Sequence, residues 1–288
     1  MTGAAIISLD CEGRWGVADH LTPETALGLT DARLRTAYRD LIRLLADAHI
    51  HATFAFVGLF TRPASRETTE LVQERAAHLP YLTRAAAGLA DAEEGWIGDW
   101  ALDMAAEQGH EIAFHGTTHV PWPDLSRDQA RWEMEQVQPD HRQTMVFPRN
   151  QIAHVDVLEE FGCKAFRGAR EFPTRAQSLL SEFNCLTPSQ TVPDRMKAAP
   201  VEIPSGVFIN WRSGMRKLVP PPVTRLRARN LLNHAAKTGG VAHFWLHPEN
   251  VATAPATMTN VSAIVEEIVR FRDAGHIRVE TQLSMLSA

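Results

Sequence analysis

Two acidic residues separated by a single position follow the first apolar segment of the chain. Asp10 and Glu12 come directly after residues 4–9 (AAIISL), and residues i and i+2 of an extended chain point to the same face. They could share one cavity, with one carboxylate binding a metal ion and the other accepting a proton. Cys11 would point away, although a thiolate is also a zinc ligand. The structural alternative is that Asp10 ends a strand and Glu12 is exposed.

A pair of histidines, His115 and His119, occurs four residues apart in the segment HGTTH. If the chain turns helical there, positions i and i+4 fall on one face, where two imidazoles could bind one ion. Two histidines and one carboxylate are a typical set of protein ligands for catalytic zinc. Two solvated or hydrogen-bonded histidines remain the alternative.

Short apolar segments alternate with longer amphipathic ones along the whole chain. This alternation predicts parallel β/α units, in a barrel or a doubly wound sheet. We expect an α/β fold, a distorted (β/α) barrel with about seven parallel strands, in a single domain over residues 1–288. A helical insertion is expected at residues 63–108, interrupted near 80 and 95–98. The predicted strands are residues 4–9, 52–60, 111–114, 145–147, 164–166, 201–203 and 241–246, with a closing strand at 277–280.

Ionisable residues follow four of these predicted strands. Besides the acids and the histidine pair, Arg149 follows the fourth strand and His247 follows the strand at 241–246. Because catalytic groups of β/α barrels sit at the carboxyl ends of strands, these side chains are expected at one edge. His243, four residues before His247, is expected in a deeper layer as a satisfied core histidine, and His110 is expected to be structural.

The composition excludes several classes of protein. The chain has 288 residues, 44% hydrophobic and 22% charged, which is ordinary globular usage. A net charge of −5 argues against nucleic acid as a partner. Three cysteines without a CxxC pair argue against a disulfide framework. We expect no membrane span and no signal peptide, and hence a cytoplasmic location.

The order of motifs resembles the polysaccharide deacetylase family, also called carbohydrate esterase family 4, between residue 7 and about residue 250. The segment SLDCEG at residues 8–13 stands where the family has TFDDG, and HGTTH matches its H-[ST]-x-x-H motif. FPRNQ at residues 147–151 stands where the family has a motif with arginine and proline after its fourth strand. The apolar residue followed by histidine at a strand end is matched by Leu246 and His247.

The resemblance implies a role for each matched residue. Asp10 would be the general base, Arg149 would orient it, and His247 would be the general acid. The metal, Zn²⁺ or another divalent ion such as Co²⁺, would be bound by His115, His119 and a residue of the first motif. The family's second aspartate is replaced by Cys11, and a D-x-[DE] spacing selects Glu12 instead. The aspartate that polarises the acid histidine lacks a clear counterpart, with Glu171, Asp194 and Glu202 as candidates.

The activity implied is removal of an N-acyl group, most simply acetyl, from an amino sugar or glycoconjugate. A small or carrier-linked N-acetylated sugar is the expected partner. A backbone N–H near Asn150 could share the charge of the oxyanion. Cyclic-amide or formamide hydrolysis on the same fold, and a carbohydrate-binding pseudoenzyme, are the alternatives.

The basic segment 212–229 is either a solvated face or a site that binds the phosphate of a carrier-linked sugar. The candidate substrate-binding residues also include an apolar set near the predicted edge, with core packing as its alternative: Trp15, Trp122, Trp245 and Leu246.

Overall fold

The strands of the protein form one parallel sheet. The computed structural model describes residues 2–169, 174–186 and 199–287. Nine strands lie in these ranges, and every pairing between them is parallel. Their bounds are β1 Gly3–Cys11, β2 Thr53–Phe56, β3 Glu111–Phe114, β4 Thr144–Val146, β5 Ala165–Arg167, β6 Val201–Ile203, β7 Val207–Phe208, β8 Val241–Leu246 and β9 Ile277–Glu280.

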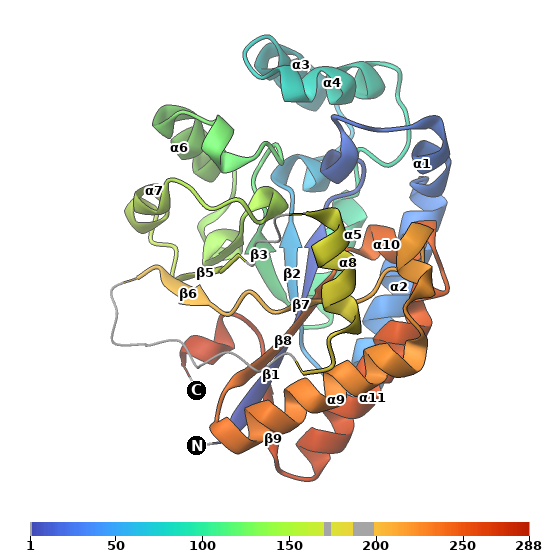
Figure 1. Cartoon of the computed structure of the whole chain (residues 1–288). Helices are drawn as coiled ribbons and strands as arrows, with labels where there is room; N and C mark the ends of the chain where they lie inside the picture. Colours follow the sequence, from blue (N-terminus) through green and yellow to red (C-terminus); the bar gives the residue numbers. More distant parts are fainter. Residues whose placement is uncertain (1, 170–173, 187–198, 288) are drawn as a thin grey trace.

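The sheet curls so that its two edges approach each other. Its order is β6-β5-β4-β3-β2-β1-β8-β7, with β9 paired to the first half of β1 (Figure 1). The edge strands β6 and β7 are joined by residues 204–206 alone. Since a chain spans at most about 3.3–3.6 Å per residue, this link holds the two edges close together. The distorted (β/α) barrel expected from the sequence is therefore confirmed.

Strand β1 is the centre of the sheet. All of its residues are buried, as expected for a parallel strand with both faces covered. It continues through Cys11, one residue beyond the expected stop at Asp10. The prediction of one strand over residues 52–60 was wrong beyond Phe56, because residues 58–61 form a 3₁₀ turn. Leu59 and Phe60 of that turn are buried in the core. The residues are therefore apolar because they are buried, and not because they belong to a strand.

Helices cover the sheet, and the helical insertion lies where it was expected. Residues 63–108 hold α3, α4 and α5, with breaks at 77–82 and 91–98. Figure 1 shows α3 and α4 beyond the end of the sheet toward which β2 points. Ser126 and Gln129 form a capping box at the start of α6. The helix bounds are α1 Pro23–Gly28, α2 Asp31–Asp47, α3 Arg66–Ala76, α4 Thr83–Ala90, α5 Asp99–Glu107, α6 Arg127–Glu135, α7 Val155–Glu160, α8 Arg175–Phe183, α9 Pro221–Thr238, α10 Pro248–Thr253 and α11 Thr257–Asp273.

The basic segment folds into internal ion pairs and backbone contacts instead of an open cationic face. Arg225 and Arg229 of α9 both donate to Glu267, whose side chain is fully buried on α11. Arg212 donates to the carbonyl of Val219, and Arg216 pairs with Glu182 of α8. Across the described residues, the helices are all too short or too polar to cross a bilayer.

Candidate metal centre and catalytic groups

Six ionisable side chains converge at the carboxyl ends of four strands. Asp10 and Glu12 come from the end of β1, the two histidines of HGTTH follow β3, Arg167 ends β5, and His247 follows β8. This is the edge at which parallel β/α folds place their reacting groups. The prediction that residues distant in sequence meet at this edge is confirmed for both acids and for all three histidines.

The carboxylate of Glu12 lies between the two histidines of HGTTH. Nε2 of His115 and Nε2 of His119 are each 3.0 Å from the same oxygen, Oε1. The helical turn that would place the two histidines on one face is not present. Residues 115–119 form an irregular loop instead, in which Gly116 has φ 73° and His119 has φ 61°. These left-handed residues fold the loop back so that both rings face Glu12.

The donor set fits a divalent cation. Nδ1–H of His115 donates to the carbonyl of Val146 at 2.7 Å, which leaves Nε2, the nitrogen that faces Glu12, as the one able to bind a cation. Burial lowers the pKa of His119 by more than the attraction of Glu12 raises it, which favours the neutral form of this ring. An imidazole lone pair that faces a carboxylate oxygen at 3.0 Å is repelled by it unless a cation lies between the two. The three ligand atoms lie within 4.8 Å of one another. Imidazole nitrogens with a carboxylate suit Zn²⁺ or Co²⁺.

Cys11 lies on the other side of β1. Its side chain belongs to the hydrophobic core, and Sγ is 3.6 Å from the carbonyl oxygen of Leu9. Burial raises the pKa of the thiol well above its usual value, which opposes formation of the thiolate that metals bind. The alternation of side chains along β1 thus separates Cys11 from Glu12.

The Glu12 carboxylate occupies space that a side chain at position 16 would fill, and Gly16 leaves this space free. A Cβ atom at this position would lie 1.7 Å from Oε2 of Glu12. Replacement by alanine, Gly16→Ala, is therefore expected to displace the carboxylate from both histidines and to weaken zinc binding without altering a ligand. Competition with a chelator measures the dissociation constant, and thermal unfolding of the metal-free protein is the control. Unchanged zinc affinity would show that Glu12 does not bind the ion in this position.

The HGTTH loop is held by a buried glutamate that sequence reasoning missed. Glu133 of α6 accepts from the backbone N–H groups of Thr117 and Thr118 and from the hydroxyl of Thr118, at 2.5–3.1 Å. Burial raises the pKa of Glu133 to about 7, although these donors oppose the rise. The signal was available, because this acid lies among the buried residues Ala130 and Met134 on the inner stripe of α6.

Glu133 is a positioning residue for the histidine pair. Glu133→Gln replaces an acceptor by an NH₂ group that faces backbone donors, and is expected to weaken metal affinity about 10–100-fold. Glu135→Gln, at an exposed position of the same helix, is the matched control. Equal zinc affinity in the two variants, measured by competition titration, would remove Glu133 from this role.

A second buried glutamate holds the backbone of the first motif. Glu249 of α10 accepts from the N–H groups of Glu12 and Gly13 at 3.1 and 2.6 Å. Burial and the neighbouring carboxylate of Glu12 raise the pKa of Glu249 to about 8. It follows His247 by two residues, so α10 links the acid histidine to the loop that carries Glu12.

Asp10 is bound by Arg167 in a bidentate pair. The two guanidinium nitrogens lie 2.7 and 2.6 Å from the two carboxylate oxygens, and both side chains are buried. Burial alone would raise the pKa of Asp10. Arg167 and the nearby histidines lower it by more than burial raises it, so the pKa lies below its ordinary value. Asp10 is therefore ionised at neutral pH and able to accept a proton.

The expectation that Arg149 orients Asp10 is wrong. Arg149 has φ 55°, and its guanidinium donates to Asp19 at 2.5 Å and to the hydroxyl of Tyr81 at 3.1 Å. The Tyr81 hydroxyl also lies 3.4 Å from Nδ1 of His119. Arg149 thus lies at the rim of the groove, where the helical insertion contributes Tyr81.

A buried polar layer supports the Asp10–Arg167 pair from below. Arg167 also donates to Ser8, whose hydroxyl is 2.8 Å from Nε2 of His243. Nδ1 of His243 lies 2.7 Å from the carbonyl of Pro204. Burial and Arg167 lower the pKa of His243 to about 3, so the ring is neutral. The prediction of His243 as a satisfied histidine in a deeper layer is confirmed.

His247 faces both acids across the groove. Its Nε2 is 3.4 Å from Glu12 and 3.9 Å from Asp10. Burial lowers the pKa of His247, but these carboxylates raise it to about 10, so the ring carries a proton to donate. Nδ1 is 3.1 Å from Oδ1 of Asn250. An amide thus takes the place expected for a polarising acid.

Of the three candidates for that acid, Glu202 does not fill the role. Glu202 is exposed on β6, whereas Glu171 and Asp194 lie outside the described residues.

Three of the expected substrate-binding residues are core residues. Trp15 and Trp122 have no exposed surface. Leu246 is buried in the core, on the face of β8 opposite to that of Trp245. Trp15 donates its indole N–H to the carbonyl of Trp96, and Trp122 packs edge-on against Phe147. The backbone N–H of Asn150 itself donates to the carbonyl of Phe147, so this particular N–H is not directed toward an oxyanion. Trp245 and the Asn150 side chain do line the groove.

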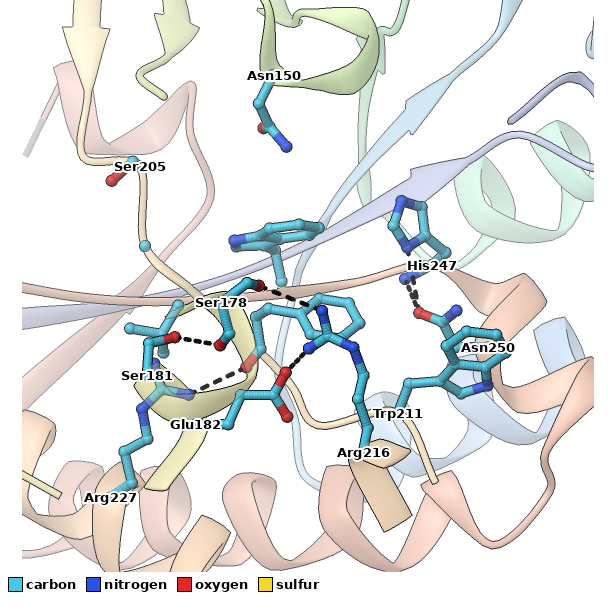
Figure 2. A pocket seen from close by; sticks show the side chains of 14 residues that line it. Asn150, Ser178, Ser181, Glu182, Ser205, Trp211, Arg216, Arg227, His247 and Asn250 are labelled. Carbon is cyan, nitrogen blue, oxygen red and sulfur yellow. Dashed lines mark hydrogen bonds and ion pairs between the residues drawn. The ribbon is translucent and has the colours of Figure 1, made fainter. Parts of the chain in front are cut away.

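Two hollows adjoin at His247. A groove of about 440 Å³ contains Asp10, Glu12 and His119, and a cavity of about 380 Å³ lies beyond His247. Figure 2 shows this cavity, with Glu182 and Arg216 paired on one side and His247 beside Asn250 on another. Trp211, Trp245 and His247 border both hollows.

Comparison with known proteins finds a family model that matches part of the chain. Residues 22–148 match the model of the family described as polysaccharide deacetylase. The matched range contains both histidines of HGTTH, whereas Asp10, Glu12 and His247 lie outside it. Residues 22–148 are thus similar to a polysaccharide deacetylase domain, which agrees with the resemblance of the motifs. None of the curated proteins matches the sequence.

Two solved structures share the fold over nearly the whole chain. A protein of Mycobacterium smegmatis, described as a "putative polysaccharide deacetylase", is 15% identical, with a TM-score of 0.61 over 99% of this chain and 89% of that one. A mutant of a CE4 family pseudoenzyme with restored enzymatic activity is 14% identical, with a TM-score of 0.50 over 99% and 68%. At these identities the likeness establishes the fold.

Proposed function

We propose that this chain is a metal-dependent hydrolase that removes an N-acyl group from an amino sugar or glycoconjugate. The acyl group is in the first place acetyl. The match of residues 22–148 to the polysaccharide deacetylase model supports this proposal. The observation that carries the proposal is the placement of a Glu-His-His cluster beside both Asp10, which Arg167 pairs, and His247. Glu12, His115 and His119 would hold the ion, Zn²⁺ or Co²⁺. When bound, a divalent ion supplies a Lewis acid that polarises a carbonyl and acidifies water.

The remaining chemistry belongs to side chains of this chain. Asp10, kept ionised by Arg167, accepts a proton from the water that attacks the amide carbonyl. His247 donates its proton to the nitrogen as the C–N bond breaks, which releases a carboxylate and an amine. Asn250 holds the opposite ring nitrogen, so Nε2 of His247 points into the groove. Trp245 forms an apolar wall beside that nitrogen.

Product analysis tests the proposal against its alternatives. The zinc- or cobalt-loaded protein is incubated with N-acetylated sugars, their glycosides and nucleotide derivatives, formamido sugars and a cyclic amide such as hydantoin. Acetate release from an amino sugar is the expected result. Formate release or ring opening without acetate would replace the N-deacetylase assignment by the other hydrolase activities. Metal and sugar binding without any turnover would indicate a carbohydrate-binding pseudoenzyme.

A further inference from the structure

Apart from His247 and its neighbours Trp245 and Asn250, most of the cavity beyond His247 is lined by segments that carry none of the proposed catalytic groups. Its wall residues come from α8, from β7 and the segment after it, and from α9 (Figure 2). The proposed metal ligands Glu12, His115 and His119 border only the groove or lie outside both hollows. His247 therefore stands at the boundary, with the ion site on one side and the cavity on the other.

The position of His247 determines which half of a substrate this cavity receives. A proton donor must lie within hydrogen-bond reach of the leaving nitrogen. The carbonyl belongs on the side of Glu12, so the group attached to nitrogen extends past His247 into the cavity. Under the proposed function, that group is the amino sugar.

The walls of the cavity combine aromatic faces with hydrogen-bonding groups. Trp245 and Phe208 pack with ring centroids 4.9 Å apart, and Trp211 lies near His247. Arg216 lies 5.0 Å over the Phe208 ring and pairs with Glu182, whose side chain is only 2% exposed. Because the carboxylate offsets the guanidinium charge, this pair offers donors and acceptors to hydroxyl groups. Apolar walls with a few oriented polar groups are typical of small-molecule sites.

The size and closure of the cavity limit what can enter. Its volume of about 380 Å³ is near the low end of the range for small-molecule sites, about 300–1,000 Å³. Ser178, Ser181 and Glu182 of α8 form its wall on the side away from His247. An internal unit of a polymer would need open space on both sides of its ring, which α8 occupies.

Resting on the proposed function, we propose that this cavity binds the amino sugar that leaves, as a single unit or as the end of a chain. The Glu182–Arg216 pair hydrogen-bonds its hydroxyl groups, and Trp245 and Phe208 contact its ring. The enzyme therefore deacetylates small or terminal N-acetylhexosamine units and not internal units of a polymer.

A defined set of oligosaccharides tests this assignment. Methyl glycosides and tetramers of N-acetylhexosamines are treated with zinc-loaded enzyme, and tandem mass spectrometry locates each deacetylated unit. Activity on the monomers, and loss of acetyl from one terminal unit of the tetramers, are expected. Deacetylation of internal units would overturn the assignment.

A pair of variants on α8 tests the cavity itself. Ser181→Trp fills it and is expected to lower kcat/KM for the methyl glycosides about 10²-fold, mainly through KM. Hydrolysis of trifluoroethyl acetate, whose leaving group is small, should fall far less. Leu180→Trp, on the exposed side of the same helix, is the matched control. An equal loss on both substrates, or a loss confined to substrates with large acyl groups, would contradict the assignment.

A binding measurement separates failure of this inference from failure of the proposed function. The methyl glycoside of glucosamine, the amine product, is the probe, and saturation-transfer NMR detects its contact with the protein. Binding that Ser181→Trp abolishes and Leu180→Trp preserves supports the cavity assignment even if turnover is absent. Turnover without any effect of Ser181→Trp on binding would overturn the cavity assignment and leave the proposed activity standing.

Discussion

Asparagine in place of Asp10 is expected to lower turnover of an N-acetylated substrate about 10²–10⁴-fold while the metal stays bound. The variant removes the group that accepts the proton of the attacking water, and leaves Glu12 and both histidines unchanged. Acetate release under saturating substrate measures the effect on kcat, and elemental analysis measures retained zinc. Turnover within a few-fold of the unsubstituted protein would show that another group is the base.

The same substitution has a structural consequence that the sequence alone did not predict. Asp10→Asn leaves the buried guanidinium of Arg167 without its carboxylate partner. Breaking a buried pair in this way costs about 3–5 kcal/mol of stability. A lower unfolding temperature is therefore expected together with the lost turnover, and kinetics must be measured well below the transition. Asp10→Asn/Arg167→Met removes both charges, so it should recover stability but not activity.

Alanine in place of His247 is expected to lower amide turnover about 10²–10⁴-fold, with unchanged zinc content. The nitrogen of an amide leaves only when protonated, and His247 is the group opposite Glu12 that can donate. An activated ester such as 4-nitrophenyl acetate has a leaving group that needs little protonation, so its hydrolysis should fall much less.

The matched control for that substitution is His78→Ala, at an exposed histidine outside the groove, which should leave both reactions unchanged. Equal losses of amide and ester turnover in His247→Ala would indicate a binding or structural role instead of proton donation.

Most of the site could be predicted from two rules: side chains alternate along a strand, and the carboxyl ends of parallel strands lie at one edge of the sheet. An extended chain puts Asp10 and Glu12 on one face whatever the rest of the fold does, and this local rule also separated Cys11 from them. The convergence of residues from β1, β3 and β8 follows equally from the parallel arrangement of the strands. Both rules depend on backbone direction alone, which the apolar pattern reveals.

The errors arose where tertiary contacts or unusual backbone angles decide the outcome. The positive φ of Arg149 carries its side chain to Asp19, and the arginine that binds Asp10 comes from β5, with no spacing relation to the first motif. Trp15 and Trp122 lie near the predicted edge in sequence, but burial depends on what packs above them. Glu133 and Glu249 act by accepting backbone N–H groups, which no motif displays.

Metal content is the measurement that tests the central claim most directly. Unsubstituted protein, Glu12→Gln and Cys11→Ser are loaded with zinc, dialysed against a weak chelator and analysed for metal per chain, with thermal unfolding to confirm that each is folded. The account predicts one ion per chain in the unsubstituted protein and in Cys11→Ser, and little in Glu12→Gln, because a neutral amide offsets less of the ion's charge. Loss of zinc in Cys11→Ser with retention in Glu12→Gln would contradict it.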